Sequence, residues 1–165
     1  MDEIRLIDVR KSILSDNENQ AQVIRQGLSE KGVFLLNIMA SPGAGKTSII
    51  IQTIRRLKEQ LRMAVIEGDI ESLVDSEKIQ GEGVPAVQIR TGGACHLDAP
   101  MVTAALDSLN LDALDLVFVE NIGNLICPAE FDLGSNLQAM ILSVPEGDYK
   151  ILKYPLMFTV CDVLL

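Results

Sequence analysis

Short apolar runs alternate along this chain with stretches in which apolar residues recur at helical spacing. The run VFLLNIM at 33–39 is short and mostly apolar, which predicts a buried strand. The stretch at 46–61 places apolar side chains on one face, which predicts a helix; these are Ile50, Ile54, Leu57 and Leu61. Further strands are predicted at 63–68, 85–90, 114–120, 137–144 and 159–165, and further helices near 70–81 and 97–109. This alternation is typical of βαβ units, so we expect an α/β fold with a mostly parallel sheet covered by helices on both faces.

The two ends of the chain have different predicted roles. Residues 1–31 form a predicted N-terminal helical segment, in which AQVIRQGLSEKG follows the cap-like SDNEN and Gly32 supplies a stop. The last run, TVCDVLL, is strand-like and has nothing after it. At 165 residues the chain corresponds to one domain. We therefore expect a single domain that is a fragment of a longer chain.

The composition of the chain limits the range of possible functions. Hydrophobic residues make up 48% of the chain, aromatics only 4%, and Trp is absent, so we expect an aliphatic core. The net charge of −9 argues against nucleic-acid binding, which needs a clustered basic surface. No apolar run approaches the roughly 20 residues needed to cross a bilayer, and no signal peptide is visible at the start. The three cysteines are widely spaced and predict free thiols in a cytoplasmic protein.

The strongest chemical signal is ASPGAGKTS at 40–48. It matches the phosphate-loop pattern Gly-x-x-x-x-Gly-Lys-Ser/Thr, with Ala40 in place of the first glycine. The glycines allow backbone N–H groups to face an anion at a helix N-terminus. Lys46 can reach the β- and γ-phosphates and the Thr47 hydroxyl can bind Mg²⁺. The alternative is a glycine–proline turn that merely enters a helix. The predicted nucleotide-binding residues are Ser41, Gly43, Ala44, Gly45, Lys46, Thr47, Ser48, Glu120 and Gly123.

Two carboxylates follow predicted strands. Asp69 and Glu120 would lie at the edge of a parallel sheet where ligands bind. We expect Asp69 to act with Lys46 in catalysis by orienting the attacking water or by binding Mg²⁺, and Glu120 to support the metal. The alternative for each is a solvated carboxylate at the start of a loop. Glu71 and Asp75 are predicted to lie on a solvated helix face.

Five segments of the chain together resemble the HypB family of nickel-incorporation GTPases in hydrogenase maturation: NIMASPGAGKTS, VIEGDIESLVDSEKI, QIRTGGACHLDAPMV, LVFVENIGNLICPAEFDLG and SVPEGDYKILKYPLMF. The resemblance covers about residues 5 to 165. It implies a single three-layer α/β/α P-loop GTPase domain of the dimer-forming, SIMIBI-like class, with slow GTP hydrolysis to GDP. It also implies a homodimer that depends on nucleotide and metal, a nickel-binding maturation partner, and a hydrogenase large-subunit precursor as the recipient.

Residues 92–100, GGACHLDAP, contain the only histidine of the chain beside a cysteine. From the residues alone, Cys95, His96 and the distant Cys127 fit a buried thiol and a surface histidine as well as a metal site. The resemblance implies that the three bind Ni²⁺ or Zn²⁺ at a dimer interface. Thiolate and imidazole ligands suit these ions, whereas Mg²⁺ requires oxygen. Cys161, within the last predicted strand, is expected to be a core residue.

The family's guanine-reading motif, Asn-Lys-x-Asp, would follow DVLL, so the resemblance implies a chain truncated at its C-terminus. We expect residues 1–165 to bind GTP and ATP with similar affinity. The N-terminal cysteine motif and histidine-rich tract of some members are not found in these residues. Two other functions remain open: an ATPase of the same dimeric class, and a nucleotide-binding module without turnover.

The spacing of the segment ENIGNLICP suggests that the two sites communicate. Gly123, where a γ-phosphate sensor would lie, precedes Cys127 by four residues, a span of at most about 14 Å. We therefore expect the nucleotide state to alter metal affinity and dimerisation.

Overall fold

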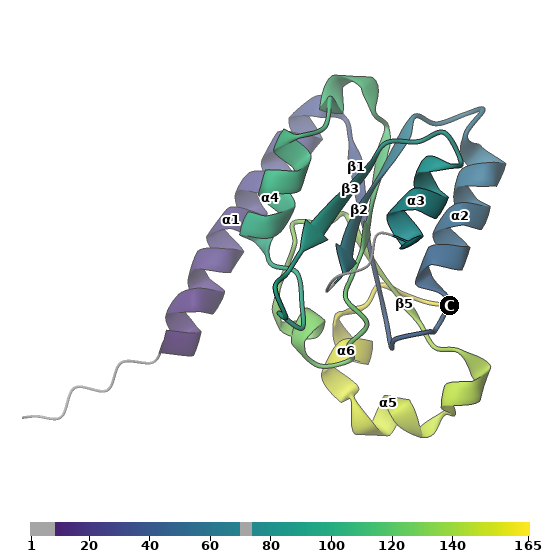
Figure 1. The fold of residues 1–165 in the computed structure, drawn as a ribbon. Helices are drawn as coiled ribbons and strands as arrows, with labels where there is room; N and C mark the ends of the chain where they lie inside the picture. Colours follow the sequence, from purple (N-terminus) through teal and green to yellow (C-terminus); the bar gives the residue numbers. More distant parts are fainter. Residues whose placement is uncertain (1–8, 70–73) are drawn as a thin grey trace, which may run out of the picture.

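The computed structural model describes residues 9–69 and 74–165. Figure 1 shows their order as α1 (Val9–Lys31), β1 (Phe34–Ala40), α2 (Lys46–Leu57), β2 (Met63–Asp69), α3 (Val74–Gln80), β3 (Ala86–Arg90), α4 (Ala99–Asp107), β4 (Leu116–Glu120), β5 (Leu137–Ile141), α5 (Tyr149–Lys153), α6 (Pro155–Val160) and β6 (Val163–Leu164). Short 3-10 helices lie at Leu111–Ala113, Cys127–Glu130 (η2) and Val144–Glu146. Within the described ranges, no helix combines the length and the apolar character needed to span a lipid bilayer.

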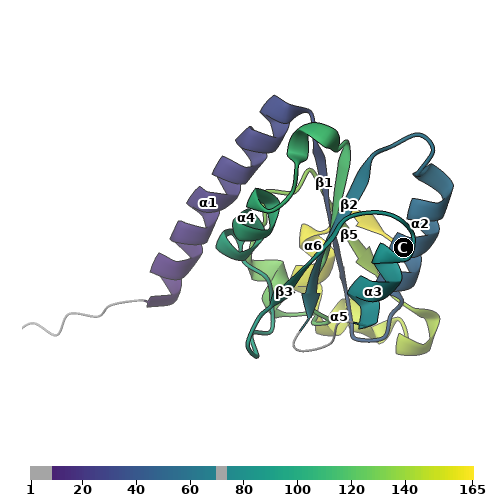
Figure 2. The ribbon, with the colours of Figure 1, turned by 45° about the horizontal axis from the view of Figure 1, so that its top comes forward.

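The strands form one parallel sheet in the order β3-β2-β4-β1-β5-β6. Helices α1 and α4 cover one face and α2 and α3 the other, as Figures 1 and 2 show. This confirms the predicted three-layer α/β fold. Strand β1 lies between β4 and β5, with Ile38 opposite Glu120 and Ala40 opposite Ile141. Because the strands are parallel, the loops that follow β1, β3 and β4 all emerge at one edge of the sheet.

Aliphatic side chains fill both faces of the sheet, as the composition predicts. On the α2 side, Ile50 and Ile54 are fully buried against Phe118, which confirms that part of the predicted apolar face. The helix ends at Leu57, so Leu61, predicted on the same face, lies beyond it. Fully burying one such side chain contributes about 1.5–3 kcal/mol. A third, smaller cluster joins Met39 and Met140 to Met157 of α6. Helix α2, which begins at the phosphate loop, is therefore anchored to the centre of the sheet.

Helix α1 begins at Val9, before the cap-like segment SDNEN that the sequence suggests as its start. The polar segment SDNEN at 15–19 lies inside the helix rather than capping it. Asn17 is 4% exposed because its side chain is used in tertiary contacts: Nδ2 donates to the carbonyl of Asp132 (2.8 Å) and Oδ1 accepts the N–H of Ala99 (2.7 Å). The helix ends at Lys31, immediately before Gly32, as predicted.

The strand predicted at 159–165 is wrong over most of its length. Its first two residues belong to α6, which starts at Pro155, and β6 covers only Val163–Leu164. Proline at the first helical position favours the helix, and Thr159 Oγ1 donates to the carbonyl of Pro155 at 2.8 Å. Cys161 lies between the two elements, half-buried against the Met157 cluster. The predicted helix near 70–81 is described only over Val74–Gln80, so Glu71 falls outside the described residues.

Candidate functional site: a phosphate loop beside a cysteine–histidine triad

The loop between β1 and α2 has the backbone geometry of an anion-binding turn. Gly43 and Gly45 adopt φ values of 74° and 101°, a left-handed region that disfavours other residues. Gly45 caps the N-terminus of α2 and its carbonyl accepts the N–H of Ile49 at 3.0 Å. Ala40 is fully buried as the last residue of β1, so a position that is glycine in the usual pattern tolerates a Cβ here. The positive end of α2 therefore points into a glycine-lined turn, which favours a phosphate.

Lys46 and Thr47 project from the first turn of α2 toward β4. Lys46 is only 8% exposed, and burial lowers the pKa of its ammonium, against the opposing influence of nearby carboxylates, Glu120 foremost. The Thr47 hydroxyl donates to Oε1 of Glu120 at 2.7 Å. A hydroxyl beside a carboxylate is an oxygen donor set that fits Mg²⁺. A desolvated ammonium next to it gains from an anionic ligand.

A cleft of about 230 Å³ opens beside these residues. It is lined by Pro42, Lys46, Glu67, Gly68, Asp75, Glu120, Asn121, Ile122 and Gly123. Two of its carboxylates were not predicted to be there. Glu67 of β2 lies opposite Glu120 of β4 in the strand register. It is 2% exposed and accepts a hydrogen bond from Ser76 Oγ at 2.7 Å. Asp75 was predicted to face solvent, but it is half-buried at the cleft while also pairing with Lys78.

The remaining predicted nucleotide-binding residues occupy different positions around the loop. Ser41 is buried at the start of the phosphate loop, at 8% exposure. Ala44 is half-buried, and Ser48 is exposed in the first turn of α2. Asp69 is the last residue of β2, and its side chain lies outside the described part of the chain. The catalytic and binding roles assigned to all of these residues stay predictions.

Gly123, in the loop after β4, packs closely against Pro42 of the phosphate loop. A Cβ at this position would lie 2.7 Å from both the N and the Cα of Pro42. The neighbouring Asn124 N–H donates to the carbonyl of Ala40 at 3.0 Å. No side chain fits at Gly123 unless the phosphate-loop backbone moves, so this loop sets the position of the nucleotide-binding turn.

Gly123→Ala should therefore weaken triphosphate binding. Overpacking of a tight contact costs about 1–3 kcal/mol, and if the loop bears that cost, affinity falls by roughly 5- to 150-fold. Titration with a fluorescent nucleotide measures the effect. Gly27→Ala is the matched control, because Gly27 lies on the exposed side of α1 with nothing within 4 Å of its Cβ position. Equal affinities in the two variants would contradict this role for Gly123.

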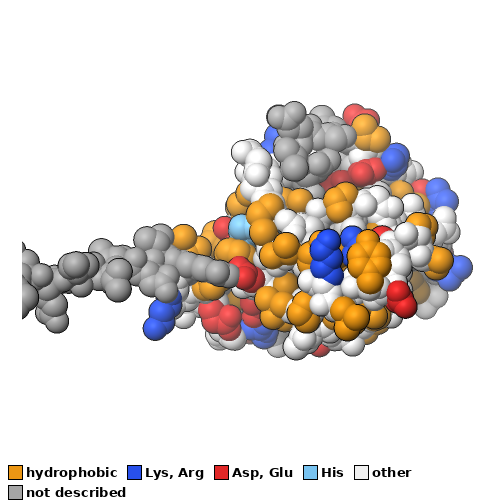
Figure 3. Space-filling view, turned by 90° about the horizontal axis from the view of Figure 1, so that it is seen from below, with side chains coloured by type: hydrophobic (Ala, Val, Ile, Leu, Met, Phe, Trp, Pro, Cys, Tyr) orange, Lys and Arg blue, Asp and Glu red, His pale blue; other side chains and the backbone are white. Residues whose placement is uncertain are grey.

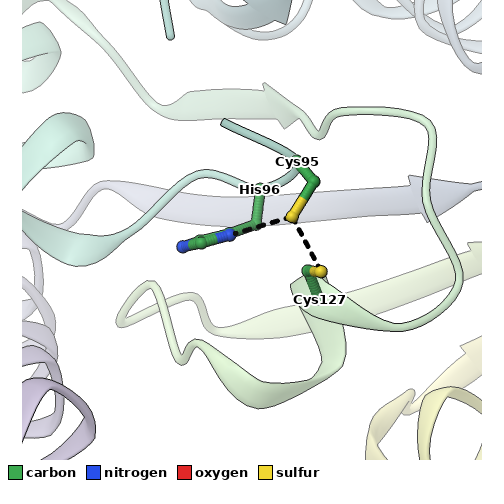
Figure 4. A group of neighbouring side chains, drawn as sticks. All are labelled: Cys95, His96 and Cys127. Carbon is green, nitrogen blue, oxygen red and sulfur yellow. Dashed lines mark hydrogen bonds between the residues drawn. The ribbon is translucent and has the colours of Figure 1, made fainter. Parts of the chain in front are cut away.

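Cys95, His96 and Cys127 come together at the same edge of the sheet, as Figure 4 shows. Cys95 and His96 lie in the loop after β3, and Cys127 begins η2. Cys95 Sγ lies 3.6 Å from His96 Nδ1 and 2.8 Å from Cys127 Sγ, and all three ligand atoms lie within 4.8 Å of one another. In a tetrahedral site, metal–ligand lengths imply distances between ligands of roughly 3.5–3.8 Å. The residues fit a Zn²⁺ or Ni²⁺ ion once the two sulfurs separate slightly.

The protein environment favours the metal-binding form of His96 but disfavours that of Cys127. Phe131 stacks on the His96 ring, with centroids 3.8 Å apart, and so restricts its orientation. Burial lowers the pKa of His96, which favours the neutral imidazole that binds metals. The hydrogen bond with Cys95, followed by burial, raises the pKa of the Cys127 thiol. Because a thiolate is the ligand, the metal displaces a proton there and its affinity rises with pH.

Comparisons with known proteins identify the family of this chain. Residues 34–143 match the family described as CobW/HypB/UreG, nucleotide-binding domain. The chain is 46% identical over its whole length to hydrogenase maturation factor HypB of Rhizobium leguminosarum bv. viciae and covers 55% of that protein. It is 42% identical over its whole length to HypB of Escherichia coli K12 and covers 57%. It is 40% identical to the probable HypB of Methanocaldococcus jannaschii, with 98% of this chain and 73% of that protein covered.

Solved structures extend the agreement to three dimensions. The crystal structure of Helicobacter pylori HypB in complex with nickel has a TM-score of 0.85 at 39% identity, covering 90% of this chain and 70% of that one. Archaeoglobus fulgidus HypB has a TM-score of 0.84 at 39% identity, covering 91% and 73%. The signal recognition particle receptor FtsY of Elizabethkingia anophelis, at 15% identity and a TM-score of 0.61 with coverages of 94% and 61%, shares the fold alone.

The parallel sheet and its phosphate loop define a nucleotide-binding domain with a P-loop fold. The chain belongs to the CobW/HypB/UreG family, and the relatives that it matches at 39–46% identity are HypB proteins. It spans somewhat more than half the length of the first two relatives described above.

Proposed function

We propose that this protein binds GTP, hydrolyses it slowly to GDP, and uses this cycle to deliver nickel during hydrogenase maturation. The observation that carries the proposal is that one loop, the loop after β4, contacts the phosphate loop and also contains Cys127. The loop after β4 contacts the phosphate loop through Gly123 and Asn124, and it supplies Cys127 to the metal-binding triad three residues later. This contact supports a link between a proposed phosphate site and a proposed metal site.

The nucleotide half of the function rests on Lys46, Thr47 and Asp69. Lys46 would neutralise charge on the β- and γ-phosphates, which is worth most in a desolvated position. Thr47, with Glu120 behind it at 2.7 Å, would hold Mg²⁺. When bound, the ion neutralises charge that develops on the phosphate oxygens. Asp69, at the end of β2, would orient the attacking water.

The metal half rests on two thiols and an imidazole. These ligands select Ni²⁺ or Zn²⁺ over Mg²⁺, and three of them leave one position of a tetrahedral ion open. An open position is what a carrier needs in order to pass its cargo to a ligand of another protein. We propose that the cargo is nickel, that a nickel-binding maturation protein and the hydrogenase large-subunit precursor are the partners, and that the protein works in the cytoplasm.

A homodimer is part of the proposal. Figure 3 shows the lower face of the molecule, where hydrophobic side chains gather around a few basic ones. Apolar residues on and near α5 and α6 are exposed, among them Val144 at 95% and Leu152 at 86%. Exposed apolar patches of this kind mark surfaces that bind other proteins. This supports a subunit contact near the nucleotide site.

The proposal is tested on the intact maturation factor by measuring binding and turnover of GTP and ATP side by side, with Mg²⁺ present. We expect GTP to bind more tightly by about tenfold or more, equivalent to roughly 1.4 kcal/mol, and to turn over slowly. Faster turnover of ATP would indicate an ATPase of the same class. Binding without any turnover would indicate a regulatory nucleotide-binding module, and either result would overturn the proposal.

A further inference from the structure

Asn124 touches both sites at once. Its backbone N–H donates to the carbonyl of Ala40, where the phosphate loop begins, at 3.0 Å. Its side-chain Nδ2 donates to the carbonyl of Cys95 at 3.2 Å. Its Oδ1 accepts the N–H of Ile126 at 2.8 Å and that of Cys127 at 3.4 Å. One residue thus bonds the phosphate-loop strand and the backbones of two of the three metal-ligating residues.

The chemistry of the side chain matters to this arrangement. A primary amide carries donors and an acceptor at the same end, and both kinds are used here, one toward the loop after β3 and one toward η2. A carboxylate would lack the donor, and a serine is shorter and offers a single oxygen. The loops that carry Cys95 and Cys127 are separated by 32 residues in sequence, and the amide holds them together across that separation.

We propose that Asn124 is the positioning residue that couples nucleotide binding to metal binding, an inference that rests on the proposed function. Movement of the phosphate loop shifts Ala40 and Pro42, which contact Asn124 and Gly123 directly. The Asn124 backbone follows Ala40, and its amide transmits the shift to the backbones of Cys95 and Cys127. The distance between the two sulfurs, and so the affinity for the metal, then depends on the nucleotide. By linkage, the metal alters nucleotide affinity by the same factor.

The test compares Ni²⁺ affinity, measured with a competing chelator, in the GDP-bound protein and in the protein with a non-hydrolysable GTP analogue. The ratio of the two affinities is the coupling factor. In Asn124→Ala we expect the coupling factor to fall to within about twofold of 1, while nucleotide affinity without metal changes by less than about twofold, because the backbone N–H remains. Thiolate-to-nickel charge-transfer absorption, which reports ligand geometry, should differ between nucleotide states in the wild type and not in the variant.

Two further variants separate coupling from stability. Asn136→Ala removes a comparable hydrogen bond, from the N–H of Leu35 to Oδ1 at 2.8 Å, at the other end of β1, and should leave the coupling factor unchanged. Asn124→Ser retains an oxygen that can accept the Ile126 N–H, but the shorter side chain cannot also reach the Cys95 carbonyl. It therefore keeps the test available if the alanine variant does not fold. It should also lose the coupling.

Each outcome bears on one proposal. A folded Asn124 variant that keeps the wild-type coupling factor, or an Asn136→Ala variant that loses it, overturns the role of Asn124. Equal Ni²⁺ affinities in the two nucleotide states of the wild type also overturn it, while leaving both binding activities in place. A wild-type protein that binds no triphosphate or no Ni²⁺ overturns the proposed function itself.

Discussion

Lys46→Ala is expected to lower the affinity for nucleoside triphosphates by about a hundredfold, equivalent to roughly 2.7 kcal/mol. The ammonium lies at the start of α2, is 8% exposed and has its pKa lowered by burial. Hydrogen bonds that involve a charged group contribute about 1.5–3 kcal/mol, and a desolvated ammonium lies at the upper end of that range. Titration with a fluorescent nucleotide analogue measures the loss.

The control for Lys46 is a lysine at the opposite end of the same helix. Lys58, at the C-terminus of α2, is exposed and points away from the cleft, so Lys58→Ala should bind nucleotide like the wild type. Ni²⁺ titration of the Lys46 variant should give the wild-type affinity in the absence of nucleotide, because the triad does not contact Lys46. Unchanged triphosphate affinity in Lys46→Ala would contradict the assignment of the phosphate loop.

Cys127→Ala should lower the affinity for Ni²⁺ or Zn²⁺ by at least about a hundredfold. The substitution removes one of three ligand atoms that lie within 4.8 Å of one another, and nothing else in the triad replaces the thiolate. Because Cys127 is the ligand carried by the loop that contacts the phosphate loop, the difference in metal affinity between the GTP- and GDP-bound forms should also disappear. Nucleotide binding without metal should persist. Metal titration with a competing chelator measures both effects, and sedimentation reports dimer formation in each state.

Cys161→Ala is the matched control for the thiol. Cys161 is the third free cysteine, half-buried between α6 and β6, where its Sγ donates to the carbonyl of Phe158 at 3.4 Å. Its removal should leave metal affinity unchanged. If the Cys127 variant bound Ni²⁺ as tightly as the Cys161 variant, the triad would not be the metal site. Equal metal affinities in the two nucleotide states of the wild type would leave the triad as a static site.

The elements that the sequence predicts well are those set by local pattern. The strand ending at Ala40, the turn at Gly43 and Gly45, and the helix beginning at Lys46 follow from a buried run, two left-handed positions and an amphipathic face. Each depends on neighbours within a few residues, so the phosphate loop could be placed before its surroundings were known. The grouping of Cys95, His96 and Cys127 came from the resemblance, because 32 residues separate the two thiols and no local rule spans that distance.

The errors occur where a distant contact overrides a local preference. SDNEN resembles a helix cap, but Asn17 lies within α1 because its amide satisfies backbone groups of Asp132 and Ala99. Asp75 has the helical spacing of a solvated residue, and the packing of α3 beside β2 and β3 brings it to the cleft. The partners of Asn17 are distant in sequence, so pattern alone assigns it to the wrong environment; Asp75 remains 35% exposed while it lines the cleft.

The sequence by itself determined that this is an α/β protein with a phosphate loop, and its motifs identified the family. Those features depend on the periodicity of side chains and on backbone conformations that only glycine adopts readily. Only the tertiary structure decided that Glu67 joins Glu120 at the cleft, that Gly123 supports Pro42, and that Asn124 bonds both sites. Because the strands pair in parallel, in the order β3-β2-β4-β1-β5-β6, the loops after β1, β3 and β4 lie at one edge of the sheet. Strand order is set by long-range packing and pairing, which no local stretch of residues encodes.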